Sequence, residues 1–177
     1  MFQNILVALD RSAASTQVFD EALHLAKKTG ADLMLLHVLS TEDDGSPDVL
    51  TFPPMHYYSS LMGASLEKFR QQWEAVEADG IEFLQMLTDE ATAAGVDTEF
   101  TQHAGSPGRV ICDVADRWDA DLIVMGRRGL AGVREALVGS SSNYVMHRAG
   151  CSVLLVQPLD EPGLLPQLKT REMAAKL

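Results

Sequence analysis

The stretch MGRRGLAGVREALVGSSSNYV, residues 125–145, contains four glycines and ends beyond a run of three serines. The apolar run DLIVMG, residues 121–126, leads into it, and the apolar run CSVLLVQP, residues 151–158, follows it. Short apolar runs of this kind are typical of buried strands. Glycine disfavours a helix, whereas serine is favoured where a helix begins. The stretch therefore predicts a loop between two strands, with a helix that starts in the serine run and ends at Gly150.

The rest of the chain shows the same alternation of strands and helices. Apolar runs and helical periodicity predict strands at 4–9, 31–39 and 97–104, and helices at 12–29, 64–94 and 107–118. Strands that alternate with helices imply a parallel sheet with right-handed crossovers. The sequence therefore predicts a single-domain α/β fold, an open five-stranded parallel sheet with helices on both faces.

The composition is that of an acidic globular protein. The chain has 177 residues and a net charge of −11, with 46% hydrophobic and 22% charged residues. This charge disfavours nucleic acid and anionic membranes as partners, because both attract positively charged proteins. We expect one domain at residues 1–158 and a tail at 159–177. Since neither a signal peptide nor a membrane-spanning segment is recognisable, we expect a cytoplasmic protein.

Two segments do not fit the alternation. Residues 42–63 have turn chemistry without periodicity, and a loop of this length in a compact domain is usually functional or disordered. We expect a loop insertion here, and it is a candidate lid. The tail at 159–177 follows the last strand and forms at most a short helix. The acidic face of the long helix, from Glu67 to Glu90, is read as a solvated surface, with partner docking as the alternative.

Few side chains suggest metal binding or covalent chemistry. Cys112 and Cys151 lack a CxxC spacing and sit in apolar surroundings, which favours buried thiols over a disulfide or redox pair. The five histidines show no metal-ligand spacing, so we expect no metal site built by the protein. No Ser/His/Asp or Cys/His arrangement is visible, and we assign no catalytic residue.

The carboxyl ends of the strands are where an open parallel sheet binds its ligands. The first strand ends with Ala8, Leu9 and Asp10, the second with His37 and Val38, and the fourth with Met125 and Gly126. If the first and fourth strands are neighbours, these residues converge on one crevice. Asp10 has two interpretations that the spacing leaves open. It is either a contact to a ribose or an acidic residue at the helix N-terminus near Ser12.

Glycines and serines beside this crevice form a candidate phosphate site. Gly126 and Gly129 would let the backbone turn and approach a ligand closely, as would Gly139 just before the serines. The serines, which would begin a helix, are Ser140, Ser141 and Ser142. Helix N-termini bind phosphate through free N–H groups, and the hydroxyls add donors. The alternative is a glycine-rich loop with serine caps and solvated arginines.

The helix dipole alone would not hold a polyphosphate on so acidic a protein. It contributes about 0.3–1 kcal/mol. Direct donors must therefore supply most of the binding, and Arg127 or Arg128 would add charge-assisted hydrogen bonds. Spacing does not say which of the two arginines does so. The motifs GxxxxGK[ST] and GxGxxG are absent, which excludes a P-loop and the usual dinucleotide fingerprint.

Taken together, these motifs resemble the universal stress protein family, and specifically its ATP-binding branch. The pattern G-x2-G-x9-G-S is met by Gly126, Gly129, Gly139 and Ser140, and the chain opens with ILVALD. The resemblance covers residues 3–157. It implies the strand order 3-2-1-4-5 of a Rossmann-like, adenine nucleotide alpha hydrolase-like fold. It also implies ATP as the ligand and a homodimer formed through the last strand, at Val153–Val156.

The resemblance also implies roles for individual residues. The adenosine would lie at Ala8–Asp10, with Asp10 bonding the ribose and the Val38 backbone meeting the adenine. Residues 126–132 would wrap the ribose and phosphates, and residues 139–142 would cradle the phosphates, with Mg²⁺ held through them. The expected ligand-binding residues are Ala8, Leu9, Asp10, Val38, Met125, Gly126, Arg127, Arg128, Gly129, Gly132, Gly139, Ser140, Ser141 and Ser142.

Three functions follow as hypotheses. The first is an ATP-binding regulatory protein of the stress-response type. The second is a slow ATPase or nucleotide-transferring enzyme that uses the same pocket, although no obvious general base is placed to activate water. The third is a dimeric scaffold whose crevice is empty or holds another small ligand, such as a flavin. In each case the apolar last strand needs cover, which a second copy or the tail would supply.

Overall fold

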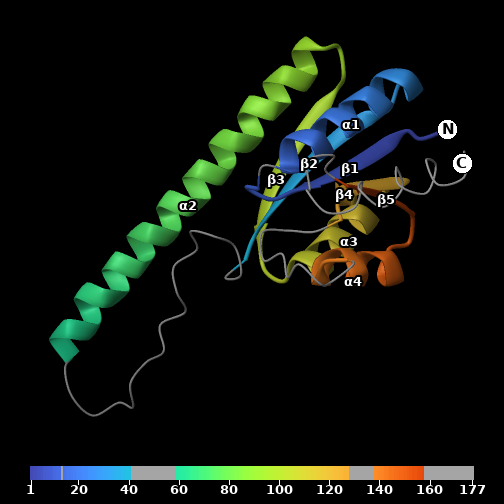
Figure 1. Cartoon of the computed structure of the whole chain (residues 1–177). Helices are drawn as coiled ribbons and strands as arrows, with labels where there is room; N and C mark the ends of the chain where they lie inside the picture. Colours follow the sequence, from blue (N-terminus) through green and yellow to red (C-terminus); the bar gives the residue numbers. More distant parts are fainter. Residues whose placement is uncertain (13, 41–58, 128–137, 158–177) are drawn as a thin grey trace, which may run out of the picture.

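The computed structural model describes residues 1–12, 14–40, 59–127 and 138–157 (Figure 1). Five parallel strands form one sheet in the order β3-β2-β1-β4-β5. The strands are β1 (Asn4–Leu9), β2 (Asp32–Leu39), β3 (Thr98–Ala104), β4 (Leu122–Gly126) and β5 (Ser152–Val156). The helices are α1 (Ala14–Thr29), α2 (Ser59–Ala93), α3 (Pro107–Arg117) and α4 (Ser140–Arg148). The predicted fold class and strand order are confirmed.

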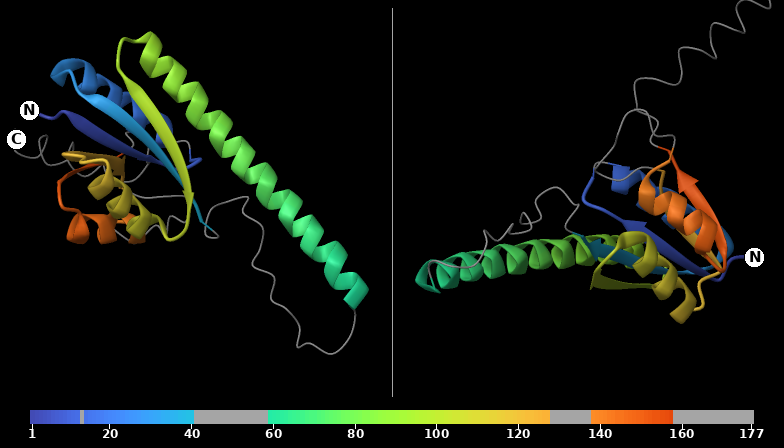
Figure 2. Two further views of the ribbon diagram at one scale, coloured as in Figure 1. Left: turned by 180° about the vertical axis from the view of Figure 1, so that it is seen from behind. Right: turned by 90° about the horizontal axis from the view of Figure 1, so that it is seen from below.

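Helices cover both faces of the sheet because strand residues alternate between two apolar clusters. Ile5 and Val7 pack with Phe19 of α1 and Leu84 of α2 in one cluster. Leu6 lies in the other cluster, with side chains of α3 and α4. Figures 1 and 2 show the two helix layers on opposite sides of the strands. Every position of β2 after its first residue is buried, which is why the sequence shows an unbroken apolar run there.

Helix α2 is longer than predicted. It begins at Ser59, so the prediction that residues 59–63 belong to a loop is wrong. Gly63 lies within this helix, and one glycine costs a helix interior only about 1 kcal/mol relative to alanine, which a long helix tolerates. Figure 2 shows that the N-terminal part of α2 extends beyond the sheet. Among the α2 residues whose burial is described, which are residue 67 and residues 70–93, the buried ones are Gly80, Leu84, Leu87 and Ala91.

The other predicted boundaries are close to the observed ones. Helix α1 begins at Ala14 rather than at residue 12, and α4 ends two residues before the predicted Gly150. Ser106 is the N-cap residue of α3 and Pro107 is its first residue, as predicted, although the Ser106 side chain makes no capping bond. Residues 42–58, the tail at 159–177, Arg128, Gly129 and Gly132 lie outside the described residues.

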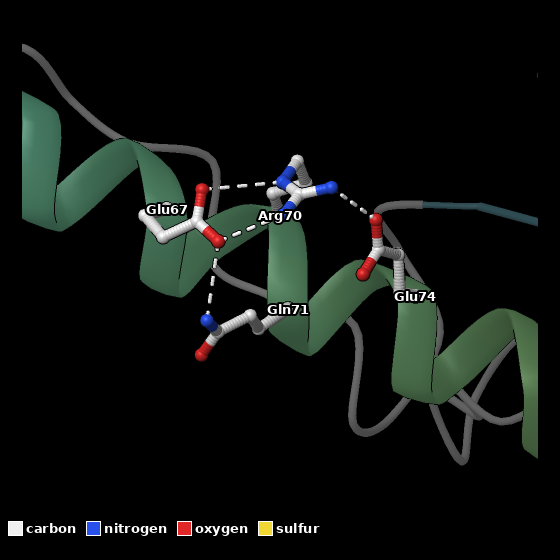
Figure 3. Close-up of polar contacts among 4 residues, drawn as sticks. All are labelled: Glu67, Arg70, Gln71 and Glu74. Atoms are coloured by element: carbon white, nitrogen blue, oxygen red, sulfur yellow. Dashed lines mark hydrogen bonds and ion pairs between the residues drawn. The ribbon is translucent and has the colours of Figure 1, made fainter.

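The acidic face of α2 is solvated in its first half, as the sequence predicted. Arg70 lies between two glutamates on successive turns, 2.8 Å from Glu67 and 2.7 Å from Glu74 (Figure 3). Hydrogen bonds from Arg70 and then Gln71 lower the pKa of Glu67, and the same pairing with Glu67 raises the pKa of Arg70. The side chains of Arg70, Glu67 and Glu74 are at least half exposed, so water and salt screen the ion pairs, which therefore add little to stability.

Candidate functional site

The carboxyl ends of β1, β2 and β4 meet at one edge of the sheet. β1 lies between β2 and β4, and Ala8 is aligned with Leu36 on one side and Met125 on the other. The first and fourth strands are therefore neighbours, which is the arrangement that the predicted crevice requires. Ala8, Val38 and Met125 all belong to the apolar cluster on the α3/α4 face. These three predicted residues are brought together on one side of the sheet.

Leu9 is placed differently from its neighbours. Its side chain is buried in the opposite cluster, beneath α1 and α2. This follows from the strand geometry, because successive side chains point to opposite faces. Leu9 can therefore contribute to a ligand site at this edge only through its backbone.

Two hydrogen bonds join the end of β4 to the start of α4, and a third joins it to the end of β5. The Ser142 hydroxyl donates to the Gly126 carbonyl at 2.8 Å. The Gly139 N–H donates to the Arg127 carbonyl at 2.9 Å, and the Arg127 N–H donates to the Val156 carbonyl at 2.9 Å. The two glycine-containing segments, separated in sequence, are thus held against each other and against the end of β5.

These bonds identify the donors that remain at the start of α4. The Gly139 N–H and the Ser142 hydroxyl already have protein acceptors. The first turn of an α-helix leaves its N–H groups without intrahelical acceptors, which here are those of Ser140, Ser141 and Ser142. The hydroxyls of Ser140, which is exposed, and Ser141, which is half-buried, add two more groups. Five donors therefore lie at one helix N-terminus, a favourable site for an anion.

Gly139 has an extended backbone that any residue adopts, with φ −65° and ψ 158°. Gly126 ends β4 and is not among the glycines with positive φ. Neither glycine is therefore required for an unusual backbone conformation. Both glycines lack a side chain at the point where β4 meets α4, which leaves space there.

Asp10 organises the turn between β1 and α1. Its Oδ1 atom accepts hydrogen bonds from the Ser12 N–H at 3.1 Å, the Ser12 hydroxyl at 2.5 Å and the Ser15 hydroxyl at 2.8 Å. Asp10 is thus the acidic residue at a helix N-terminus that one interpretation proposed. No hydrogen bond from the described residues reaches its second oxygen, Oδ2, so the ribose interpretation is compatible with the same geometry.

Ser15 is a buried member of this turn that sequence reasoning missed. The residue is 3% exposed, and its hydroxyl also lies 2.6 Å from the Asp10 carbonyl and 3.1 Å from the Asp10 N–H. The signal in the sequence was the spacing of Asp10, Ser12 and Ser15, in which the serines follow the aspartate by two and five residues.

His37 forms a second polar contact that the sequence did not reveal. It is 2% exposed, and its Nδ1 lies 3.2 Å from Oε1 of Gln102 on β3. The Gln102 amide nitrogen donates to the Glu77 carbonyl of α2 at 3.1 Å, so Oε1 is left as an acceptor and His37 Nδ1 carries the proton. This chain of bonds ties α2 to the carboxyl end of β2, next to Val38.

Helices α3 and α4 are in close contact at Gly108. A β-carbon added at this glycine would lie 2.9 Å from Cβ and 2.9 Å from Cδ1 of Tyr144. The Tyr144 Cβ is fixed to the α4 backbone, so relief requires the two helices to separate.

We therefore expect Gly108→Ala to destabilise the protein by about 1–3 kcal/mol, the usual cost of overpacking. Urea denaturation followed by circular dichroism measures this difference. Arg109→Ala, at the exposed neighbouring position, is the matched control and should change stability little. Equal stability of the two variants would contradict the close α3–α4 packing.

The remaining predicted features of the sequence are also located by the structure. Both cysteines are free, with Cys112 buried and Cys151 only partly buried. Burial, and then the charge of Asp116, raises the pKa of each thiol, which makes both of them poor nucleophiles.

In the described parts of the chain, no helix is long and apolar enough to cross a membrane. Nor do the described residues gather three or more His, Cys, Asp or Glu side chains in a metal-binding arrangement.

Solved structures of known proteins share this architecture. The universal stress protein UspA from Lactobacillus plantarum matches with a TM-score of 0.63 at 25% identity, covering 88% of this chain and 97% of its own. The hypothetical protein MJ0577 matches with a TM-score of 0.70 at 18% identity, covering 91% of this chain and 99% of its own. At that identity the second likeness shows the fold alone.

Sequence relatives extend over almost the whole chain. The universal stress protein Sll1388 of Synechocystis is 37% identical over 156 residues, which cover 88% of this chain and 98% of the relative. YxiE, a universal stress protein of Bacillus subtilis, is 31% identical over 159 residues, covering 89% of this chain and 100% of the relative. The family model described as the universal stress protein family matches residues 1–157. The chain therefore belongs to the universal stress protein family.

Proposed function

We propose that this chain is an ATP-binding regulatory protein that binds its nucleotide where β1 and β4 end. The observation that carries the proposal is the fixed contact between the start of α4 and the end of β4. The bonds from Ser142 to Gly126 and from Gly139 to Arg127 hold the first turn of α4 at the carboxyl edge of the sheet. That edge is where parallel sheets of this kind bind ligands.

The proposed roles follow from the position of each group. Ala8, Val38 and Met125 would form the wall for the adenine, and the Val38 backbone would bond its edge. Asp10 would accept a ribose hydroxyl with Oδ2. The N–H groups of the first α4 turn, with the hydroxyls of Ser140 and Ser141, would bind the phosphates. The buried Ser142 hydroxyl would hold that turn in place, and Gly126 and Gly139 would leave room for the phosphates.

Residues outside the described part complete the proposal. Arg128, Gly129 and Gly132 would continue the wrapping of the ribose and phosphates, and Arg127 or Arg128 would pair with a phosphate. Mg²⁺ would be held through the phosphates, because this cation keeps most of its ligands as water and phosphate oxygen.

Family structures with adenine nucleotides support the choice of ligand. One universal stress protein has been solved in complex with cAMP and another, from Archaeoglobus fulgidus, in complex with dAMP. We propose ATP rather than a nucleotide with a single phosphate because the several donors at the start of α4 can bind more than one phosphate group. We propose binding rather than rapid hydrolysis as the function.

We further propose that the protein is cytoplasmic and that β5 pairs with β5 of a second copy. β5 forms one edge of the described sheet, and Leu154 on it is 40% exposed (Figure 1). Exposed apolar edge strands need cover, and pairing with an identical strand provides it. Sedimentation at micromolar concentration tests this, and a monomer would contradict the proposed pairing at Val153–Val156.

The nucleotide carried by the purified protein tests the proposed ligand. The full chain is purified without added nucleotide, denatured, and its released small molecules are chromatographed. We expect ATP or its hydrolysis products. Release of a flavin would instead favour the scaffold with another small ligand. ATP hydrolysis well above background, lost when Asp10 or the serines at 140–142 are replaced, would favour the alternative of a slow ATPase.

A further inference from the structure

The two oxygens of the Asp10 carboxylate have different surroundings. Oδ1 is within hydrogen-bond distance of two donors of Ser12 and of the Ser15 hydroxyl. Oδ2 has no hydrogen bond among the described residues. Oδ1 is therefore held by Ser12, which precedes α1, and by Ser15 in the first turn of α1, while Oδ2 remains available as an acceptor.

Ser15 is the buried group in this arrangement. Its hydroxyl lies within hydrogen-bond distance of three Asp10 atoms, which are the carbonyl oxygen, Oδ1 and the backbone nitrogen. Ser15 also lies in the first turn of α1, so the position of its hydroxyl is fixed by the helix. Because this hydroxyl carries one proton, it donates either to the Asp10 carbonyl or to Oδ1, and its close contact with both limits the movement of the carboxylate.

We propose that Ser15 is a positioning residue for sugar recognition, which holds the Asp10 carboxylate with Oδ2 directed at the ribose hydroxyls. This inference rests on the proposed function, because it requires a nucleotide at the end of β1. A carboxylate whose rotation is already restrained loses less conformational entropy when it accepts the ribose hydroxyls. Supporting hydrogen bonds of this kind fix the geometry of the residues that contact a ligand.

The inference predicts an effect confined to nucleotides that carry ribose hydroxyls. Ser15 acts on the ligand only through Asp10, and Asp10 acts only on the sugar. 2′,3′-Dideoxy-ATP keeps the adenine and the triphosphate but lacks both hydroxyl donors. It is therefore the probe that separates sugar recognition from all other contacts.

The experiment is calorimetric titration of the full chain, in the presence of Mg²⁺, with ATP and with 2′,3′-dideoxy-ATP. We expect Ser15→Ala to weaken ATP binding about tenfold and to leave 2′,3′-dideoxy-ATP within about twofold of the original protein. Thr16→Ala removes an exposed hydroxyl from the same helical turn and is the matched control. It should leave both affinities unchanged. In an Asp10→Asn background, Ser15→Ala should have no further effect on the preference for ATP.

Ser12→Ala provides a second variant if Ser15→Ala does not fold. It removes the 2.5 Å bond to the same Oδ1 atom, and it should reduce the preference for ATP over the dideoxy nucleotide in the same way. If both nucleotides weaken equally in the variants, or if neither weakens, Ser15 does not act through sugar recognition and the inference is overturned while the proposed function stands. If the unaltered protein binds neither nucleotide, the proposed function and the inference are overturned together.

Discussion

Replacement of Gly139 by valine is expected to lower the affinity for ATP at least about hundredfold, while the fold stays intact. The backbone at Gly139, with φ −65° and ψ 158°, is extended and suits valine, so the substitution imposes no conformational strain. The bond from the Gly139 N–H to the Arg127 carbonyl also remains available. The new isopropyl group, however, stands beside the N–H groups of Ser140 and Ser141 and keeps a phosphate away from them. Charge-assisted hydrogen bonds contribute about 1.5–3 kcal/mol each, so losing two accounts for the expected drop.

Calorimetric titration with ATP measures the affinity of the Gly139→Val protein, and its thermal melt shows whether the fold is kept. Met146→Val introduces the same side chain at an exposed position of α4, away from its first turn, and should bind ATP normally. Unchanged affinity in a folded Gly139→Val protein would reject the assignment of the phosphates to this helix start.

Gly80→Val is expected to destabilise the protein by about 2–4 kcal/mol. Gly80 lies where α2 crosses the ends of β2 and β3, and a β-carbon there would meet the Gln102 Oε1 atom and lie 2.8 Å from His37 Nδ1. Gln102 is held on its other side by the Glu77 carbonyl, and His37 is buried, so neither side chain yields freely. Overpacking costs about 1–3 kcal/mol, and a buried polar group that loses its partner costs a similar amount. Removal of a glycine from a helix returns at most about 1 kcal/mol, so the penalty prevails.

Urea denaturation at neutral pH measures the effect of Gly80→Val. Ala78→Val, at an exposed position of the same helix, carries the helix-propensity cost of valine without the clash. Because Gly80→Val gains helix propensity and Ala78→Val loses it, a larger loss of stability in Gly80→Val is due to the contact with His37 and Gln102. If both lose the same stability, α2 is not tightly packed at this crossing.

The sequence predicted those parts of the structure that depend on local pattern. β2 and β4 are buried on both faces, so they appear as continuous apolar runs, and Pro107 and Gly30 mark helix ends through their own backbone preferences. The convergence of Ala8 and Met125 required one further fact, the adjacency of β1 and β4, which the family resemblance supplied.

The features that were missed depend on contacts between residues far apart in sequence. Sixty-five positions separate His37 from Gln102, and nothing local to either residue indicates the other. The sequence did not reveal that the Ser142 hydroxyl is already bonded, because its acceptor, the Gly126 carbonyl, lies sixteen residues earlier in the chain. The start of α2 was misjudged because residues 42–63 lack clear periodicity, although the last five of them begin the helix.

Titration of the unaltered full chain with ATP and Mg²⁺, after any bound nucleotide has been removed, tests the central proposal most directly. We predict a saturable heat signal with one nucleotide bound per chain, which Gly139→Val removes and Met146→Val preserves. An absence of heat up to about millimolar ATP would mean that binding is weaker than about −4 kcal/mol, and it would contradict the proposal that this family member binds ATP.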